Sequence, residues 1–323
     1  MILSPPNQVI TDSLRKDPRL LYFATYQPQF WVDEFGADRI RTFPIAEGAM
    51  VGSAIGAAIA GFHSIVHLNR ATFSFVAMDQ IANQAAKLRY MSGGQFSIGL
   101  TLRAQTRGDD YLGAQHEQSP YSLFTHIPGI KVVVPATLED AAGLYLTALN
   151  DPNTVFVFES PLLYQQSWDR NIPTDAQPIP FGQARIRREG RDVTIVAVGV
   201  MVADALAASE RLVERHNISC TVIDPRTLAP LDIGSIIASV KETGRLIVVD
   251  EAPATASIAA EIIAAVCEHP SVYGGLAAPP ARVSGAPVPA PFSPMLQPQV
   301  LPSVGRIVEA VEHVVNGEAR NHV

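Results

Sequence analysis

The sequence predicts an α/β protein built from two doubly wound domains, and three observations lead to this prediction. Short, almost entirely apolar runs alternate with stretches of helical periodicity, as in parallel sheets that helices cover on both faces. A polar, proline-rich stretch without periodicity interrupts this pattern near the middle of the chain. The length of 323 residues suits two domains of ordinary size. We therefore expect a first domain over residues 1–165, a linker over 166–182 and a second domain over 183–323.

In the first domain, four apolar or β-branched runs have the length of strands buried on both faces. Helical periodicity appears in two segments between them, and Thr137 is a plausible N-cap with Asp140 three residues further on. We expect strands at 64–68, 97–102, 131–135 and 154–159, and helices at 78–90 and 138–149.

The second domain repeats the alternation of strands and helices, which implies parallel strands joined by right-handed crossovers. Its last part is rich in proline, which indicates an extended arm followed by a final helix. We expect strands at 193–199, 220–224 and 245–250, helices at 202–215 and 233–243, the arm at 279–302 and the final helix at 304–315.

Composition and charge exclude several classes of protein. With 47% hydrophobic residues, 17% charged residues and a net charge of −7, the chain is neither disordered nor suited to nucleic acid or an anionic membrane. Cys220 and Cys267 lie in apolar surroundings without a metal or disulfide pattern, so we expect two reduced core residues. The segment 48–62 is shorter than the roughly 18 residues that cross a bilayer. No secretory signal is visible, and we expect a cytoplasmic protein.

One carboxylate stands at the start of a predicted helix of small residues. Glu47 precedes a run of Gly and Ala that ends at Phe62, and apart from Ser53 this run offers no polar side chain. Small residues let neighbouring backbones or a flat ligand approach closely, and an acid in the first turn is favoured by the helix dipole. The residues alone leave two interpretations open: an acid that stabilises a helix, or a functional group.

Two further segments carry polar or aromatic groups that suit a site. His116 lies between Gln115 and Glu117, and its imidazole can exchange protons near neutral pH, although a surface histidine is the plainer interpretation. Phe73 belongs either to the core or to a platform for a flat heterocycle. No Gly-x-Gly-x-x-Gly or Gly-Lys-Thr phosphate motif, no Gly-x-Ser-x-Gly and no His-Glu-x-x-His is present.

Several segments together resemble one family, the beta subunits of the thiamin-diphosphate-dependent first component of 2-oxoacid dehydrogenase complexes. The resemblance runs from about residue 20 to the last helix. The matching segments include Pro44-Ile45-Ala46-Glu47, Met78-Asp79-Gln80 through Gly93-Gly94-Gln95, Gln115-His116, His126-Ile127-Pro128-Gly129 and Asp224-Pro225-Arg226-Thr227.

The resemblance implies a transketolase-like pyrimidine-binding domain followed by a transketolase C-terminal-like domain. It implies that Glu47 hydrogen-bonds the aminopyrimidine of the cofactor and that Phe73 stacks on this ring. His116 would lie over the reacting carbon, and Ile45 and Val76 would contact the cofactor. A monovalent cation, such as potassium, would be bound near Ala148, Asp151 and Asn153.

The family's diphosphate motif, Gly-Asp-Gly with a later Asn, is absent, and Gly108-Asp109-Asp110 does not replace it. The resemblance therefore implies an alpha subunit that carries the diphosphate and magnesium, in an alpha2beta2 heterotetramer. The expected activity is decarboxylation of a small 2-oxoacid with reductive acyl transfer to a lipoylated acyltransferase.

Several positions depart from the family pattern, and they leave alternatives open. The family's residues are replaced at Thr42-Phe43, His67, Val76, Glu117, the loop 104–111 and Leu296-Gln297. Glu117 and the pair Asp109 and Asp110 add negative charge beside His116, which predicts a raised pKa there and an unusual substrate. One alternative is a two-subunit carboligase, acyloin-forming or transketolase-type enzyme. Another is a paralogue without catalytic activity, although Glu47 and His116 argue against it.

Overall fold

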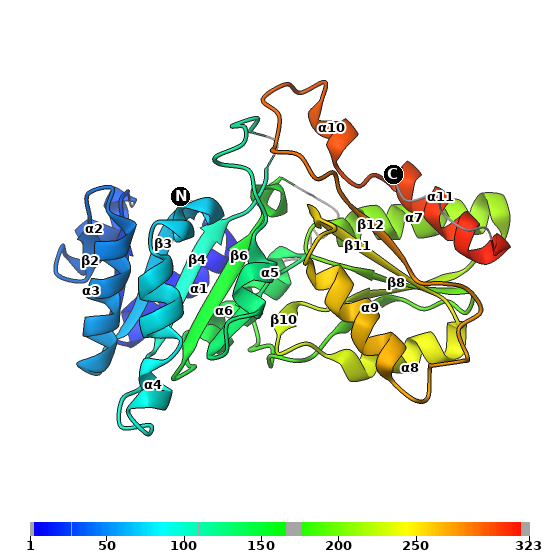
Figure 1. Cartoon of the computed structure of the whole chain (residues 1–323). Helices are drawn as coiled ribbons and strands as arrows, with labels where there is room; N and C mark the ends of the chain where they lie inside the picture. Colours follow the sequence, from blue (N-terminus) through cyan, green and yellow to red (C-terminus); the bar gives the residue numbers. More distant parts are fainter. Residues whose placement is uncertain (1–2, 27, 109, 166–175, 318–323) are drawn as a thin grey trace. The chain divides into compact units, whose positions relative to one another are not determined.

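The computed structural model describes residues 3–26, 28–108, 110–165 and 176–317. The chain divides into two compact units, Met1–Phe181 and Gly182–Val323, and each combines a sheet with helices (Figure 1). The α/β class and the presence of two domains are thus confirmed. The expected linker lies largely outside the described residues, because 166–175 belong to the part that is not described. Residues Ala176, Ile179 and Phe181 pack against the core of the first unit.

The strands of the first unit lie side by side in the order β5-β6-β4-β3-β1-β2, and each pairing between them is parallel. Val66, Leu102 and Phe156 lie in register on β3, β4 and β6 and are fully buried, as a sheet covered on both faces requires. The strands are β1 (Leu20–Ala24), β2 (Ile40–Thr42), β3 (His63–Arg70), β4 (Leu100–Gln105), β5 (Ile130–Val133) and β6 (Thr154–Glu159).

Helices cover this sheet, and their apolar faces form its core. α1 packs against α6, and α3 packs against β3 and a π-helical segment, η2. The Trp31 indole contacts Tyr22 edge to face at 4.8 Å and donates to Thr11 Oγ1, which joins α2, β1 and α1 in one cluster. The helices are α1 (Pro5–Lys16), α2 (Gln29–Phe35), α3 (Glu47–Ile59), the 3₁₀ turn η1 (Ala71–Phe75), η2 (Asp79–Ala85), α4 (Leu88–Met91), α5 (Tyr121–Thr125), α6 (Leu138–Ala148) and the 3₁₀ turn η3 (Pro161–Tyr164).

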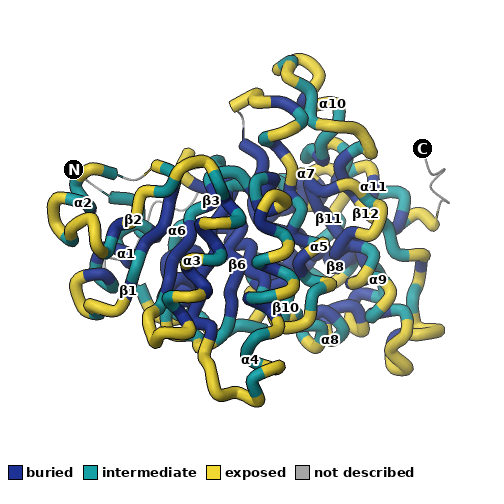
Figure 2. Tube along the Cα trace, turned by 60° about the vertical axis from the view of Figure 1, so that its left-hand side comes forward, coloured by how far each residue is buried: buried dark blue, intermediate teal, exposed yellow. Residues whose placement is uncertain are grey.

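The second unit has a sheet in the order β12-β11-β8-β9-β7, in which the pairings are parallel except for the antiparallel edge strand β7. Figure 2 shows that the strands at the centre of each unit are buried. The elements are β7 (Arg185–Arg188), β8 (Val193–Ala197), α7 (Met201–His216), β9 (Cys220–Asp224), β10 (Thr227–Ala229), α8 (Ile233–Thr243), β11 (Leu246–Pro253), α9 (Ile258–Glu268), β12 (Ala281–Gly285), α10 (Gln297–Val300) and α11 (Val304–Asn316).

Two sequence predictions differ from the structure. The predicted helix over 78–90 is divided into the π-helix η2 and the short helix α4, and the Ala86 amide donates to the Ile81 carbonyl five residues earlier. The predicted extended arm over 279–302 contains β12, which pairs with β11 and buries Val283 completely. Cys220 is buried and Cys267 is half-buried, and both are reduced. Among the described residues, no helix is both long and apolar enough to span a bilayer.

Candidate active site

Glu47 begins α3, directly after the short strand β2 and its connection. Its side chain is buried with 6% exposure, and within the described parts of the chain no group hydrogen-bonds or ion-pairs with its carboxylate. The residue as a whole is buried, its carboxylate oxygens are not fully enclosed by protein, and they have no partner among the described residues, so they are available to a ligand that supplies a donor.

The small residues of α3 allow η1 and η2 to approach it closely. A Cβ atom built at Gly48 would lie 3.5 Å from the Val76 carbonyl oxygen, and one at Gly52 would lie 3.3 Å from Gln80 Oε1. The start of α3 therefore lies against the segment that follows Phe73. The small residues at these positions allow the close approach that the sequence predicts, with a backbone at Gly48 and with the Gln80 side chain at Gly52.

Phe73 and His116 are brought together from separate segments of the first unit. Their ring centroids are 5.5 Å apart with an interplanar angle of 77°, an edge-to-face contact. Both line a hollow of about 450 Å³, which we call the His116 hollow. Its lining residues are Thr72, Phe73, Phe75, Ala114, Gln115, His116 and Gln118.

The three candidate residues follow strands of one parallel sheet. Glu47 comes after β2, Phe73 after β3 and His116 after β4. The carboxyl ends of parallel strands lie at the same edge of a sheet, where α/β proteins bind their ligands. The three residues therefore follow strands at the edge where a site is expected, and Phe73 and His116 meet there, whereas Glu47 does not line the His116 hollow.

Two of the predicted cofactor contacts are exposed apolar side chains. Ile45 is 87% exposed and Val76 is 68% exposed in this chain. Both lie near the start of α3. Ile45 precedes Glu47 by two residues in the chain, and the carbonyl oxygen of Val76 lies close to Gly48. They form an apolar rim near Glu47, which suits contact with a flat ring or with another polypeptide.

The charges around His116 differ from the sequence prediction. Arg70 Nη2 donates to Asp110 Oδ2 at 2.7 Å, so Asp110 is neutralised by an arginine from the end of β3. Glu117 is buried, and burial raises the pKa of its carboxyl, while hydrogen bonds from backbone groups and the charges of Arg107 and Arg70 act in the opposite direction. Asp109 lies outside the described residues.

Asp110 is thus paired with Arg70, whereas for Glu117 the charges of Arg107 and Arg70 oppose the effect of burial without outweighing it. The predicted effect of these carboxylates on His116 and on the choice of substrate stays a prediction. Arg70 and Arg107 are not among the residues expected at the site from the sequence. The available signal was their position, since Arg70 ends β3 and Arg107 follows β4 by two residues. Polar residues directly after buried strands of a parallel sheet lie at its ligand-binding edge.

The residues expected near a monovalent cation already have partners in this chain. Asp151 accepts from the Lys131 ammonium and from the Asn153 side chain, and Asn153 Oδ1 accepts from Arg89 at 2.7 Å. Burial raises the pKa of Asp151, but the hydrogen bonds from Lys131 and Asn153 outweigh it and the pKa is lowered. The described residues contain no cluster of three or more acidic, histidine or cysteine side chains. A cation here would depend on carbonyl oxygens such as that of Ala148, and the site stays a prediction.

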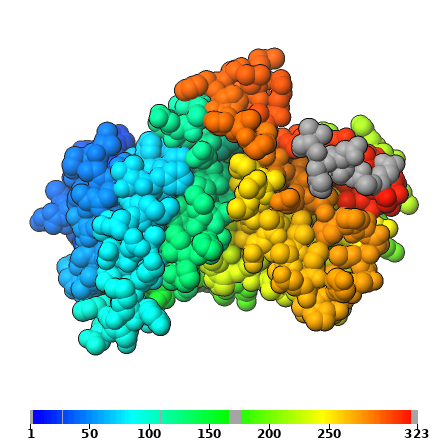
Figure 3. All heavy atoms as spheres, viewed as in Figure 1, coloured from blue at the N-terminus to red at the C-terminus, as the bar shows by residue number. Residues whose placement is uncertain are grey.

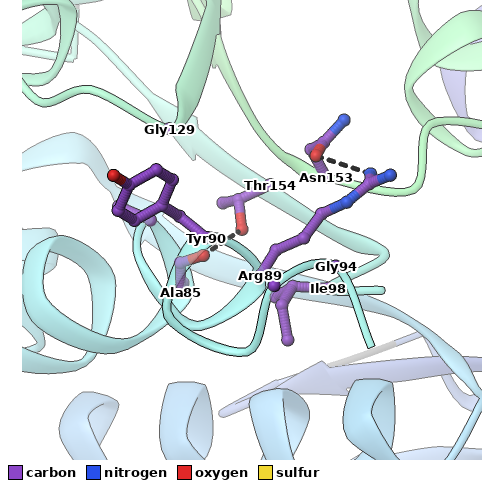
Figure 4. A pocket seen from close by; sticks show the side chains of 10 residues that line it. Ala85, Arg89, Tyr90, Gly94, Ile98, Gly129, Asn153 and Thr154 are labelled. Carbon is purple, nitrogen blue, oxygen red and sulfur yellow. Dashed lines mark hydrogen bonds between the residues drawn. The ribbon is translucent and has the colours of Figure 1, made fainter. Parts of the chain in front are cut away.

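A second hollow, of about 430 Å³, lies at the opposite edge of the sheet. Gly129, Asn153 and Thr154 line it where β5 and β6 begin, and Arg89 and Tyr90 line it from α4. Figure 4 shows Arg89 directed at Asn153 and Thr154 directed at the Ala85 carbonyl. α4 and the residues after it project from the first unit (Figure 3). This hollow belongs to the amino ends of the strands, away from the candidate active site.

Comparisons with known proteins agree with this fold. Residues 16–166 match the family model "Transketolase, pyrimidine binding domain", and residues 182–307 match "Transketolase, C-terminal domain". A solved structure described as a split gene transketolase, inactive beta4 tetramer, has a TM-score of 0.76 with 21% identity and covers 98% of both chains, which supports the fold. The chain is thus a transketolase-like protein with both of these domains.

Curated relatives show more narrowly which family the chain belongs to. The beta subunit of the pyruvate dehydrogenase E1 component from Rickettsia felis is 43% identical, covering 88% of this chain and 85% of the relative. The acetoin:2,6-dichlorophenolindophenol oxidoreductase beta subunit from Bacillus subtilis is 42% identical, covering 90% and 83%. The 2-oxoisovalerate dehydrogenase subunit beta 2 from Arabidopsis thaliana is 37% identical, covering 98% and 89%. The chain belongs to the family of beta subunits of the thiamin-dependent E1 component of 2-oxoacid dehydrogenases.

Proposed function

We propose that this chain is the beta subunit of a thiamin-diphosphate-dependent enzyme that decarboxylates a small 2-oxoacid and passes the acyl group to a lipoylated acyltransferase. The single observation that carries the proposal is the carboxylate of the buried residue Glu47, which has no partner in the described chain and lies at the ligand-binding edge of the sheet. The names of the relatives support the reaction class.

The residues present fit the pyrimidine end of thiamin diphosphate. An acid that lacks a partner, a neighbouring glycine and an aromatic ring are the groups that a flat, weakly basic heterocycle requires. When bound, the cofactor supplies a nucleophilic carbon and an electron sink for decarboxylation. Glu47 would hold a pyrimidine nitrogen of the cofactor through its carboxylate, which can accept or share a proton there. Phe73 offers a ring for stacking, Ile45 and Val76 contribute apolar contacts, and His116 moves protons in the later steps.

An alpha subunit is part of this proposal. The sequence contains no motif for a diphosphate and its magnesium ion, so a partner supplies both, in an alpha2beta2 heterotetramer. A monovalent cation such as potassium bound through the carbonyl of Ala148, near Asp151 and Asn153, is a further element of the proposal, as is a cytoplasmic location.

The test is the variant Glu47→Gln in the enzyme assembled with its alpha subunit. The amide keeps the size of the side chain but removes the proton acceptor, so we expect turnover to fall by about 10²-fold or more. Exchange of the thiazolium C2 proton, followed by NMR, should slow in parallel, while assembly stays intact. A matched control is Glu261→Gln, which changes an exposed acid in the first turn of α9. Near-normal turnover of Glu47→Gln would refute the proposal.

The second candidate keeps the cofactor chemistry but transfers the acyl unit to an aldehyde. It is favoured by the unusual loop after β4, which carries Arg107 and Asp110. Parallel assays of the assembled enzyme with lipoamide and with an aldehyde acceptor separate the two candidates. Product formation with the aldehyde alone would replace the dehydrogenase proposal.

A further inference from the structure

The loop that carries His116 is attached to the end of β3 at three successive points. We call residues 110–118 the His116 loop. Arg70 Nη2 lies 2.7 Å from Asp110 Oδ2, and Thr72 Oγ1 donates to the Gln115 carbonyl at 2.6 Å. The Phe73 ring contacts His116 itself. The order of these contacts is the same in both segments, so residues 70–73 and the His116 loop run alongside each other.

From this arrangement we propose that Arg70 is a positioning residue, which orients His116 over the substrate by tying its loop to the segment that bears Phe73. The inference rests on the proposed function, since it assumes that Phe73 and His116 act on the same bound cofactor and substrate. It adds a residue that the family resemblance does not assign to the site.

The His116 loop depends on such contacts because it forms no strand pairing. Its described part contains one turn, in which the amides of His116 and Glu117 both donate to the Gly113 carbonyl at 3.1 Å. Tyr111 has a positive φ of 52°, a conformation that costs a residue with a side chain about 1 kcal/mol or more. A loop in this state keeps a single conformation only where side-chain contacts outweigh the strain.

Arg70 interacts with charges on both sides of His116 in the loop. Its side chain is only 14% exposed, and that of Asp110 is 37% exposed, so their pair is better shielded than an ordinary surface ion pair. The Arg70 charge also acts on the buried Glu117, the residue directly after His116. The Arg70 guanidinium therefore binds the loop at Asp110, and its charge also favours the ionised form of Glu117 on the other side of the imidazole. Neutralising it would loosen the loop without touching Phe73.

The test compares Arg70→Gln with the conservative Arg70→Lys in the full-length chain, and adds Asp110→Asn alone and combined with Arg70→Gln. The first readout is hydrogen exchange of the amides of residues 113–118, measured by mass spectrometry. We expect Arg70→Gln to accelerate this exchange about fivefold or more, and Arg70→Lys to restore part of the protection. The double variant should add little to the single ones, because both remove the same pair.

The second readout uses the enzyme assembled with its alpha subunit. Exchange of the thiazolium C2 proton should be unchanged in Arg70→Gln, whereas kcat should fall about tenfold, because only the later steps require His116. A matched control is Arg15→Gln, which removes another arginine–carboxylate pair between two elements of the same unit, that of α1 with Glu34. It should change neither readout.

Three results would overturn the proposal: unchanged exchange in Arg70→Gln, faster exchange throughout the first unit, or faster loop exchange with normal kcat. A different result would show that the proposed function itself is wrong: the wild-type enzyme assembled with its alpha subunit would have no thiamin-dependent turnover. In that case the loop exchange still reports whether Arg70 holds the His116 loop.

Discussion

Arg103 on β4 donates to Glu159 on β6 from Nη2 at 2.8 Å, and the two side chains are 6% and 1% exposed. The pair joins two neighbouring strands of the first unit and is buried. Tyr164 also donates to Glu159 at 3.2 Å, and the Arg103 guanidinium lies over the Tyr145 ring. Burial opposes the charge on Arg103, but Glu159 raises the pKa of the guanidinium well above its usual range. The pair is therefore an internal crosslink between two strands.

Arg103→Met is predicted to destabilise the first unit by about 3–5 kcal/mol, because it leaves a buried carboxylate without its counter-charge. Urea unfolding measures the loss. Adding Glu159→Met should recover much of it, since the isolated charge is then removed. The exposed pair of Arg15 and Glu34 provides the comparison, and Arg15→Met should cost far less than Arg103→Met, because solvent screens an exposed pair. Equal costs for Arg103→Met and Arg15→Met would contradict the prediction.

Gly129 is predicted to tolerate no side chain. It has a φ of 100°, and an added Cβ would overlap the Ala86 carbonyl oxygen, which is backbone and cannot rotate away. Gly129→Ala should lower the melting temperature strongly, with a loss of about 3 kcal/mol or more. Gly36 has a comparable φ of 82° with nothing within 4 Å, so Gly36→Ala isolates the backbone cost of about 1–2 kcal/mol. Similar melting temperatures for both variants would show that the steric contact is unimportant.

Two histidines of β3 make stability depend on pH. Burial, assisted by the charge of Arg103, lowers the pKa of His67 to about 3, and burial lowers that of His63 to about 4. The unfolded chain protonates both imidazoles below about pH 6.5. Because the unfolded state then binds more protons, the free energy of unfolding falls as the pH decreases from 6.5 towards 4. Where a histidine is protonated in the unfolded chain and neutral in the folded chain, it lowers the free energy of unfolding by about 1.4 kcal/mol for each unit of decreasing pH.

Urea titrations between pH 7.5 and about pH 4.5 test this in His63→Gln and His67→Gln. Each variant should lose part of the slope below pH 6.5, while above pH 7 it should differ from wild type by a constant offset only. A slope identical to that of wild type in both variants would mean that other groups cause the pH dependence.

Phe73→Ala is predicted to weaken the use of thiamin diphosphate by the assembled enzyme. Loss of the ring removes a stacking surface worth about 0.5–1.5 kcal/mol, together with its apolar contact area, so the KM for the cofactor should rise about tenfold. Phe62→Ala is the matched control, because Phe62 is 38% exposed and follows the opposite end of α3. If Phe73→Ala left the cofactor KM unchanged, Phe73 would be only a packing residue.

Two strands buried on both faces could be predicted from the sequence with correct bounds, whereas β4, predicted at 97–102, spans Leu100–Gln105. β6 and β9 were predicted at 154–159 and 220–224, and these are the observed bounds, because an uninterrupted apolar or β-branched run has few alternatives. The helix after Met78 was predicted as one element, but it changes to π-helical hydrogen bonding over Asp79–Ala85. That change depends on packing against α3, which composition does not record.

The residues of the candidate site also differ in whether the sequence could predict them. Glu47, Phe73 and His116 could be named from the sequence, because their segments match a known family pattern. The positions of Arg70 and Arg107 beside the ends of buried strands could also be noted in the sequence, but not that Arg70 pairs with Asp110, because this pair arises from the apposition of β3 with a loop forty residues later in the chain.

By itself, the sequence determined the two α/β domains, the order of most strands along the chain and the identity of the acid at the start of α3. These features follow from local patterns of apolar, small and turn-forming residues. Only the tertiary structure decided that Phe73 meets His116, that Asp110 is neutralised by Arg70 and that Asp151 is already held by Lys131. Such pairings depend on which strand ends become neighbours when the sheet forms, and no local pattern of residues contains that information.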